Sequence, residues 1–132
     1  MSENKLVDDV IDFNQVVLGI QPRLKGLLID SEAEISYKCL LEEANEFMGA
    51  VETSDYIGCI DSILDSMYFA AGILYKLGLT SEEVDKCMSA VHLCNMTKKK
   101  GINSKRATGA ADAIKPDGWI SPEERIKEIL EL

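Results

Sequence analysis

Residues 56–77, YIGCIDSILDSMYFAAGILYKL, carry the pattern that decides the fold. Apolar side chains surround most of the circumference of this segment, so it predicts a long helix that lies at the centre of the protein and is buried on two sides. Asp61 and Asp65 interrupt the apolar surface, and their spacing of four residues places both carboxylates on one face of the helix. The segment therefore predicts a helical fold, and its two aspartates are candidates for a functional site within that fold.

A second long helix is predicted just before this segment, from Asp30 or Ser31 to about Glu52. Asp30 and Ser31 are suitable first residues because their side chains can accept hydrogen bonds from free amide groups. The short break at residues 53–55 favours antiparallel packing of the two helices. The apolar positions expected to face the core are Leu40, Leu41, Ala44, Phe47, Met48 and Val51.

Three further helices complete the prediction. One covers about residues 3–18 and another begins at the capping pair Thr80 and Glu83 and ends near Met96. A short terminal helix opens at Ser121 and Pro122. Residues 98–122 lack periodicity and are predicted to be a loop-rich segment over the surface. The sequence thus predicts one all-α domain over residues 1–132, with four helices and a short C-terminal helix.

The charge of the chain restricts its partners. Its 132 residues include 23 acidic and 14 basic side chains, which gives a formal net charge of −9. Such a field repels nucleic acids and anionic membranes, so we expect neither a nucleic-acid polymer nor a membrane as partner. A polyphosphate ligand would need divalent cations or local lysines to offset the same repulsion.

The cysteines and the N-terminal sequence predict a cytoplasmic location. Cys39, Cys59, Cys87 and Cys94 show no short paired spacing and lie among apolar residues, so we expect buried thiols in a reducing compartment. The polar, acidic residues 1–9 differ from the basic and then apolar start of a signal peptide.

A strip of carboxylates suggests a metal site. Glu42, Glu43 and Glu46 fall within an arc of about 100° on the second predicted helix. If the two long helices pack antiparallel, these side chains can face Asp61 and Asp65. Four to five hard oxygen ligands would then converge, a donor set that suits Mg²⁺ or Mn²⁺ and not zinc.

Simpler explanations exist for the same residues. Three glutamates on a helix often form a solvated face, and the two aspartates could pair with lysines. A di-iron carboxylate site is disfavoured because it normally needs two Glu-x-x-His motifs, and His92 is the only histidine. The metal interpretation therefore depends on the two acidic groups meeting.

Five segments together resemble the MazG-like branch of the all-α nucleoside triphosphate pyrophosphohydrolases, which is related to phosphoribosyl-ATP pyrophosphohydrolase. The matching segments span almost the whole chain: VIDFNQ at 10–15, LLEEANEF at 40–47, IDSILDSMYFAAG at 60–72, VHLCNMTK at 91–98, and DAIKPDGW with SPE at 112–123. The fourth is similar to a His-x-x-Asn-Met-Ser-Lys signature and is the most specific of the five.

The resemblance implies a role for each matched carboxylate. Glu43, Glu46 and Asp65 would bind Mg²⁺, while Asp61 and Glu42 would complete the coordination or orient a water molecule. Many members of the family carry Glu three residues before the last Asp, where this chain has Ser62. The number of metal ions therefore stays open.

The same resemblance implies where substrate binds. Asn95 and Lys98 would contact the substrate, and Asn14 and Gln15 would lie near the base, although surface polar residues on a first helix are an alternative explanation. The implied reaction converts a nucleoside triphosphate, such as a dUTP-like or dCTP-like molecule, to the monophosphate and pyrophosphate. A homodimer or homotetramer is expected. The alternatives are a catalytically weak or inactive nucleotide-binding homologue and a helical oligomeric scaffold.

Overall fold

The computed structural model describes residues 4–102 and 111–132, and these residues form five helices and a two-stranded sheet. The chain divides into two compact units, Met1–Ser81 and Glu82–Leu132, and each is described by itself. The mostly helical fold class is confirmed, and the small sheet is an addition that the sequence did not predict.

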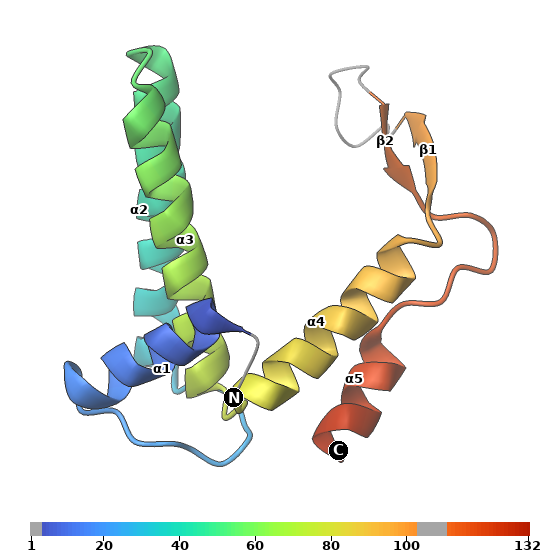
Figure 1. The fold of residues 1–132 in the computed structure, drawn as a ribbon, viewed down its shortest axis with the longest axis horizontal. Helices are drawn as coiled ribbons and strands as arrows, with labels where there is room; N and C mark the ends of the chain where they lie inside the picture. Colours follow the sequence, from blue (N-terminus) through green and yellow to red (C-terminus); the bar gives the residue numbers. More distant parts are fainter. Residues whose placement is uncertain (1–3, 103–110) are drawn as a thin grey trace. The chain divides into compact units, whose positions relative to one another are not determined.

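The first unit is built on a helical hairpin of α2 (Asp30–Glu52) and α3 (Tyr56–Lys76), which run side by side along their length (Figure 1). The turn between them is defined by its hydrogen bonds. Asp55 caps α3 by accepting a 2.9 Å hydrogen bond from the amide of Gly58. The Asp55 amide in turn donates to the carbonyl of Ala50 at 2.8 Å, so the end of α2 and the start of α3 are directly joined.

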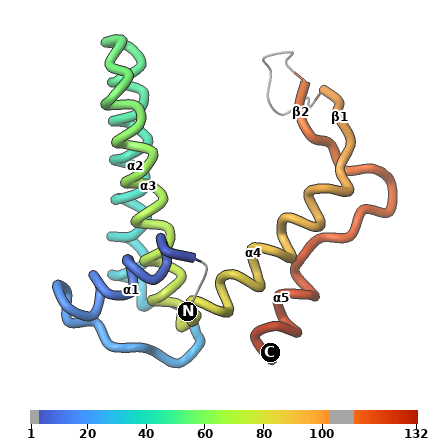
Figure 2. The backbone as a smooth tube through the Cα atoms, in the orientation of Figure 1, coloured from blue at the N-terminus to red at the C-terminus, as the bar shows by residue number. Residues whose placement is uncertain are grey.

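Helix α1 (Lys5–Val16) packs across α3 within the same unit, as the backbone trace in Figure 2 also shows. It buries Val7 and Val10, and Asn4 caps its first turn by accepting from the amide of Val7. The two helices lie close at Gly72 on α3, where a Cβ atom would make an ordinary contact with the Asn14 side chain at 3.5 Å. The contact places the end of α1 beside the C-terminal part of α3, at the end of the hairpin opposite the α2–α3 turn.

The segment between α1 and α2 closes over the C-terminal end of α3. The Gly26 amide donates to the carbonyl of Leu77, and Tyr75 donates its hydroxyl to the carbonyl of Ile20 at 2.7 Å. Gly78 has φ of +95°, and a Cβ atom there would lie 2.7 Å from the backbone of Leu24. Glycine is therefore required at this position both by the conformation and by the space.

Much of the apolar surface of the hairpin faces outward, which contradicts the expected burial. On α2, the expected core residues Leu41, Ala44, Met48 and Val51 are exposed. Helix α3 buries Ser62, Ala71, Gly72 and Tyr75 rather than its large aliphatic side chains. The prediction of a helix buried on two sides is therefore wrong for the chain by itself, because α1, α2 and the segment between them leave the large aliphatic side chains of α3 exposed.

By length and composition alone, α3 could cross a membrane: its most apolar window has a mean hydropathy of 1.4 and is 17% buried. A helix at the core of a soluble assembly passes the same test. The feature that distinguishes α3 is thus a long apolar surface that its own unit does not cover.

The second unit contains α4 (Ser81–Asn95), β1 (Lys99–Ile102), β2 (Ala111–Ile114) and α5 (Glu123–Leu130). The two strands pair antiparallel, with Lys99 opposite Ile114 and Ile102 opposite Ala111. The prediction of a segment without regular structure at residues 98–122 is therefore wrong for these strands. Gly101 makes the close pairing possible, because a Cβ atom there would meet the Ile114 side chain at 2.5 Å.

All four cysteines are free thiols. Cys87 is buried, and its burial raises the pKa of the thiol, with the nearby charge of Glu83 adding to the effect. Cys39, Cys59 and Cys94 are half-buried. The expectation of buried thiols is confirmed for Cys87 and only partly for the other three.

Candidate functional site

A buried glutamate occupies the middle of α2. Glu43 is 8% exposed, and its Oε2 atom is buried without a hydrogen-bond partner among the described residues. A buried carboxylate oxygen with no partner is unfavourable, since the ionised group has lost its water without gaining a compensating charge or donor. This atom is the clearest unexplained polar group of the first unit.

The surroundings of Glu43 raise its pKa to about 7 from the ordinary value of 4.5. Burial is the largest cause, followed by hydrogen bonding with Glu46 and by the negative charges of Glu46, Asp65 and Glu42. Helix geometry explains the effect of Glu46, which lies three residues after Glu43 and therefore on the same face of α2, whereas Glu42 is the chain neighbour of Glu43. The charge of Asp65 acts across the hairpin from α3, so the two acidic groups do approach each other.

The predicted carboxylates differ in their burial and in whether their charge acts on Glu43. Glu42 and Glu46 are exposed and Asp65 is half-buried, so all three can still reorient toward a cation. Asp61 is exposed and is not among the carboxylates that act on Glu43. The structure thus brings together four of the five predicted carboxylates and leaves Asp61 outside the cluster, which we name the Glu43 cluster (Glu42, Glu43, Glu46, Asp65).

Ser62 occupies the buried position beside Asp61. It is 2% exposed, and its hydroxyl donates to the carbonyls of Gly58 at 2.9 Å and Cys59 at 3.0 Å. Both acceptors belong to the same helix, one turn earlier. The residue that replaces the expected glutamate is therefore engaged with its own backbone, and Asp61 does not take over its buried position.

The donor chemistry of the Glu43 cluster fits a hard divalent cation. In the described parts of the chain, no group of three or more His, Cys, Asp or Glu side chains is already arranged around a metal position. The cluster nevertheless has three features that are expected of a carboxylate site for a cation. These are its oxygen donors, the raised pKa of Glu43 and the unpartnered Oε2 atom of Glu43.

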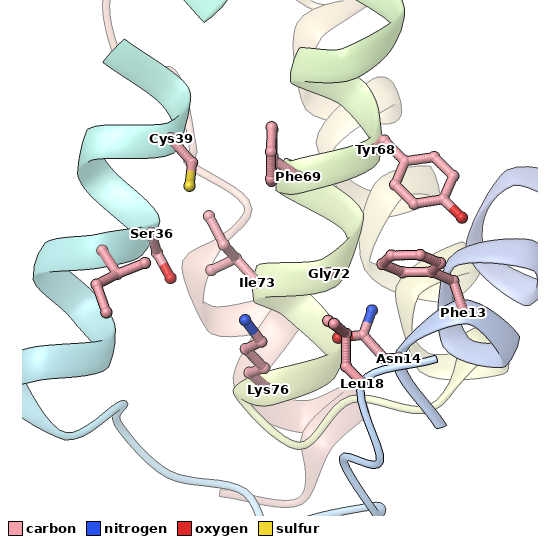
Figure 3. Close-up of a pocket in the computed structure, with 11 residues that line it drawn as sticks. Phe13, Asn14, Leu18, Ser36, Cys39, Tyr68, Phe69, Gly72, Ile73 and Lys76 are labelled. Carbon is pink, nitrogen blue, oxygen red and sulfur yellow. The ribbon is translucent and has the colours of Figure 1, made fainter. Parts of the chain in front are cut away.

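A small cavity lies between α1, α2 and α3, farther along the hairpin (Figure 3). Its volume is about 90 Å³, and its walls include the rings of Phe13, Tyr68 and Phe69. The Phe13 and Tyr68 rings meet edge to face, with centroids 5.5 Å apart. The cavity is smaller than the roughly 150 Å³ that takes up benzene, so it can hold part of a planar ring.

Asn14 and Gln15 both lie on α1, but their side chains make different contacts. Asn14 is 4% exposed, lines the cavity, and donates from Nδ2 to the carbonyl of Val10 at 2.8 Å. Gln15 donates from Nε2 to the hydroxyl of Tyr75 at 3.3 Å. Asn14 is therefore the amide that a ligand in the cavity would meet, whereas Gln15 is held at the end of α3.

The other two predicted substrate residues belong to the second unit. Asn95 is exposed at the end of α4, and its carbonyl accepts a hydrogen bond from the amide of Lys98 at 3.0 Å. The Lys98 ammonium lies 5.0 Å from the centre of the Trp119 ring. Trp119 also lines a hollow of about 400 Å³ together with Thr97 and Ile120.

Two features of these sites were not predicted. Tyr68 and Phe69 on α3 form an aromatic wall of the cavity. The sequence signal for this wall was that both residues lie about one helical turn before Gly72. Lys115 also lies 5.0 Å from the Trp119 ring centre, and the signal for it was its place four residues before Trp119 in the segment DAIKPDGW.

Comparisons with known proteins add no assignment. No protein-family model matches the chain, and a search of the curated proteins finds no relative.

Proposed function

We propose that this protein is a Mg²⁺-dependent nucleoside triphosphate pyrophosphohydrolase, which converts a nucleoside or deoxynucleoside triphosphate to the monophosphate and pyrophosphate. The observation that carries the proposal is the buried Glu43 carboxylate, which has an unpartnered oxygen and three acidic neighbours from two helices. A divalent cation would relieve the repulsion and satisfy that oxygen at once. The resemblance of the acidic segments to the MazG-like enzymes supports the same chemistry.

Glu43, Glu46 and Asp65 would hold the cation, with Glu42 completing the coordination or orienting the attacking water. The resemblance implies the same role for Asp61, but its position outside the Glu43 cluster gives that role no support. When bound, Mg²⁺ supplies charge neutralisation on the phosphates and lowers the pKa of a nearby water molecule. The carboxylates hold and orient, and no covalent intermediate on the protein is required. Water attacks phosphorus, and the departing group is pyrophosphate. Mn²⁺ has the same preference for oxygen donors.

The nucleotide would extend from the carboxylates toward the cavity of α1 and α3. A base edge entering the cavity would meet the Asn14 amide and the aromatic ring of Phe13. Gln15, Asn95 and Lys98 are proposed as further substrate contacts, with Lys98 pairing a phosphate as a point charge. The proposed substrate is a dUTP-like or dCTP-like molecule, and the proposed role is the clearing of such nucleotides from the cellular pool.

A homodimer or homotetramer is part of the proposal. The exposed aliphatic side chains of the hairpin include Ile57, Ile60, Ile63, Leu64 and Met67 on α3. A second copy would remove this surface from water, and burial of apolar area is the main driving force of such association.

The direct test is a panel of nucleoside triphosphates incubated with the full chain and Mg²⁺, with the products separated by chromatography. We expect nucleoside monophosphate and pyrophosphate. Glu46→Gln should lower turnover on the order of 100-fold or more, because it removes charge from the centre of the site. Glu52→Gln is the matched control, since Glu52 is exposed on the same helix and does not act on Glu43. Release of orthophosphate and a diphosphate would contradict the proposed bond cleavage.

A nucleotide-binding protein without catalysis is the second candidate, and the state of Ser62 favours it specifically. Ser62 stands at a buried position where many members of the resembled family carry Glu, and its hydroxyl donates to the carbonyls of Gly58 and Cys59, so this position supplies no carboxylate to a metal. This candidate predicts Mg²⁺-dependent nucleotide binding with no product in the same panel. A helical scaffold is the third alternative. It predicts no nucleotide binding and no product, and Glu46→Gln should then have no effect.

A further inference from the structure

Two lysines converge on one aromatic ring in the second unit. The Nζ atoms of Lys98 and Lys115 each lie 5.0 Å from the centre of the Trp119 ring. Lys98 precedes β1 and Lys115 follows β2, so the pair exists only because the strands form a hairpin. Continuing the register from Lys99 and Ile114 places Lys98 directly opposite Lys115.

The ring that gathers the lysines is itself held in place. Trp119 donates from Nε1 to the carbonyl of Cys94, near the end of α4, at 2.9 Å. Its amide donates to the carbonyl of Pro116 across a turn in which Gly118 has φ of +77°. These contacts hold the indole beside the end of α4 and the turn that follows β2, where both ammonium groups lie against its ring.

The arrangement leaves an electrostatic imbalance. Each nitrogen lies 5.0 Å from one centroid, so the two charges are at most about 10 Å apart, close to one screening length at physiological ionic strength. Like charges directly opposite across a hairpin repel each other. Within residues 4–102 and 111–132, no carboxylate forms an ion pair with either lysine. An ammonium over a ring face keeps other N–H donors free for a ligand.

We propose that Lys98, Lys115 and Trp119 form a polyphosphate-binding clamp, in which Lys115 is the second cation that grips the phosphate chain. A chain of two or three phosphates carries charged oxygens along its length and can meet both ammonium groups together. The clamp offsets the repulsion that a net charge of −9 exerts on such a ligand. Its assignment to the triphosphate of a nucleotide substrate rests on the proposed function, whereas the capture of a phosphate chain does not.

The test titrates inorganic tripolyphosphate into the full chain without divalent cations, by calorimetry at low salt. Trp119 is the chain's single tryptophan, so its fluorescence reports directly on the clamp. We expect saturable binding with a change in Trp119 emission, and about tenfold weaker binding in Lys98→Gln and in Lys115→Gln. Lys115→Arg should retain binding, which a purely structural role of the lysine does not predict.

Lys127→Gln is the matched control, because Lys127 belongs to the same unit and pairs with Glu124 on α5. Circular dichroism should show that every variant keeps its helices. Absence of tripolyphosphate binding, or equal binding by Lys115→Gln and Lys127→Gln, would overturn the clamp. Tripolyphosphate binding without nucleotide hydrolysis would leave the clamp standing and reject the enzyme. Nucleotide hydrolysis with unchanged KM in Lys115→Gln would reject the assignment of the clamp to the substrate triphosphate and leave the enzyme standing.

Discussion

At the scale of single residues, Glu43 is the side chain whose behaviour departs most from its ordinary chemistry. Its position on the acidic strip could be predicted from the three-residue and four-residue spacing of helices. Its burial and the approach of Asp65 could not, because both depend on how α3 lies against α2. The same contact separates Asp65, which acts on Glu43, from Asp61, which does not.

The raised pKa of Glu43 makes stability depend on pH. The folded protein holds this proton with a pKa of about 7, against 4.5 ordinarily, so the folded state binds the proton more tightly than the unfolded state. Stability from this group is present below about pH 4.5 and is lost as the pH rises to about 7. We expect Glu43→Gln to be more stable than the wild type at pH 8, with the advantage shrinking toward pH 5. Thermal unfolding in metal-free buffer measures the difference, and a constant difference across that range would contradict the assignment.

Metal affinity should follow the same proton. Mg²⁺ binds the ionised carboxylate, so binding below pH 7 must first displace a proton from Glu43. We expect Mg²⁺ to bind on the order of tenfold or more weakly at pH 5.5 than at pH 8. Calorimetry on the wild type measures this, with Glu52→Gln as control. Equal Mg²⁺ affinity at the two pH values would argue that Glu43 is not a ligand.

At the scale of helices and strands, the sequence was a good guide to where helices lie. The prediction from Asp30 or Ser31 to Glu52 agrees with α2 at Asp30–Glu52, and the prediction over residues 56–77 agrees with α3 at Tyr56–Lys76. Caps and periodicity are local properties, so they can be read without tertiary information. The strands at Lys99–Ile102 and Ala111–Ile114 were missed because each is short and pairs with a segment that lies farther along the chain.

Gly78 follows the C-terminal end of α3, and we expect it to tolerate substitution poorly. Gly78→Ala places a Cβ atom 2.7 Å from the backbone of Leu24 in a conformation with φ of +95°. We expect a loss of more than about 1 kcal/mol in the free energy of unfolding, because neither backbone segment can move away cheaply. Urea denaturation measures the change.

Gly49→Ala provides the comparison on α2. Nothing lies within 4 Å of a Cβ atom at Gly49, so the substitution should stabilise the helix by about 1 kcal/mol. The account of the α3 end would be wrong if the two alanine variants were equally stable.

At the scale of the whole molecule, the apolar surface of the hairpin is the main open feature. The chain has enough aliphatic residues on α3 for a core helix, yet Ile57 is 71% exposed and Leu64 is 56% exposed. Exposed apolar surface on this scale marks an interaction site. The proposed homo-oligomer is the simplest occupant, since a second copy offers the same apolar helices.

Ile63→Glu tests the proposed oligomer. Ile63 is 46% exposed, and its neighbours one helical turn away, Cys59 and Met67, carry no charge. In an isolated chain the substitution should change stability by less than about 0.5 kcal/mol, whereas in an oligomer it would bury a charge. We expect the wild type to sediment as a dimer or tetramer and Ile63→Glu to sediment as a smaller species.

Leu24→Glu is the control for a general effect of added charge. Leu24 is 95% exposed and lies outside the hairpin, between α1 and α2, so the variant should sediment like the wild type. A wild-type protein that stays monomeric at every concentration would exclude the oligomer.

The amino-acid sequence by itself determined the helices and the strip of glutamates on α2, because these depend on residues within about one turn of each other. The predicted cap of α2 at Asp30 or Ser31 is wrong, since the helix begins after Ile29 without a side-chain cap. Only the tertiary structure decided that Glu43 is buried beside Asp65, that the large side chains of α3 face outward, and that Lys98 and Lys115 share the ring of Trp119. The reason is physical: burial and electrostatic coupling arise between segments far apart in the chain, and no local pattern records which of those segments will meet.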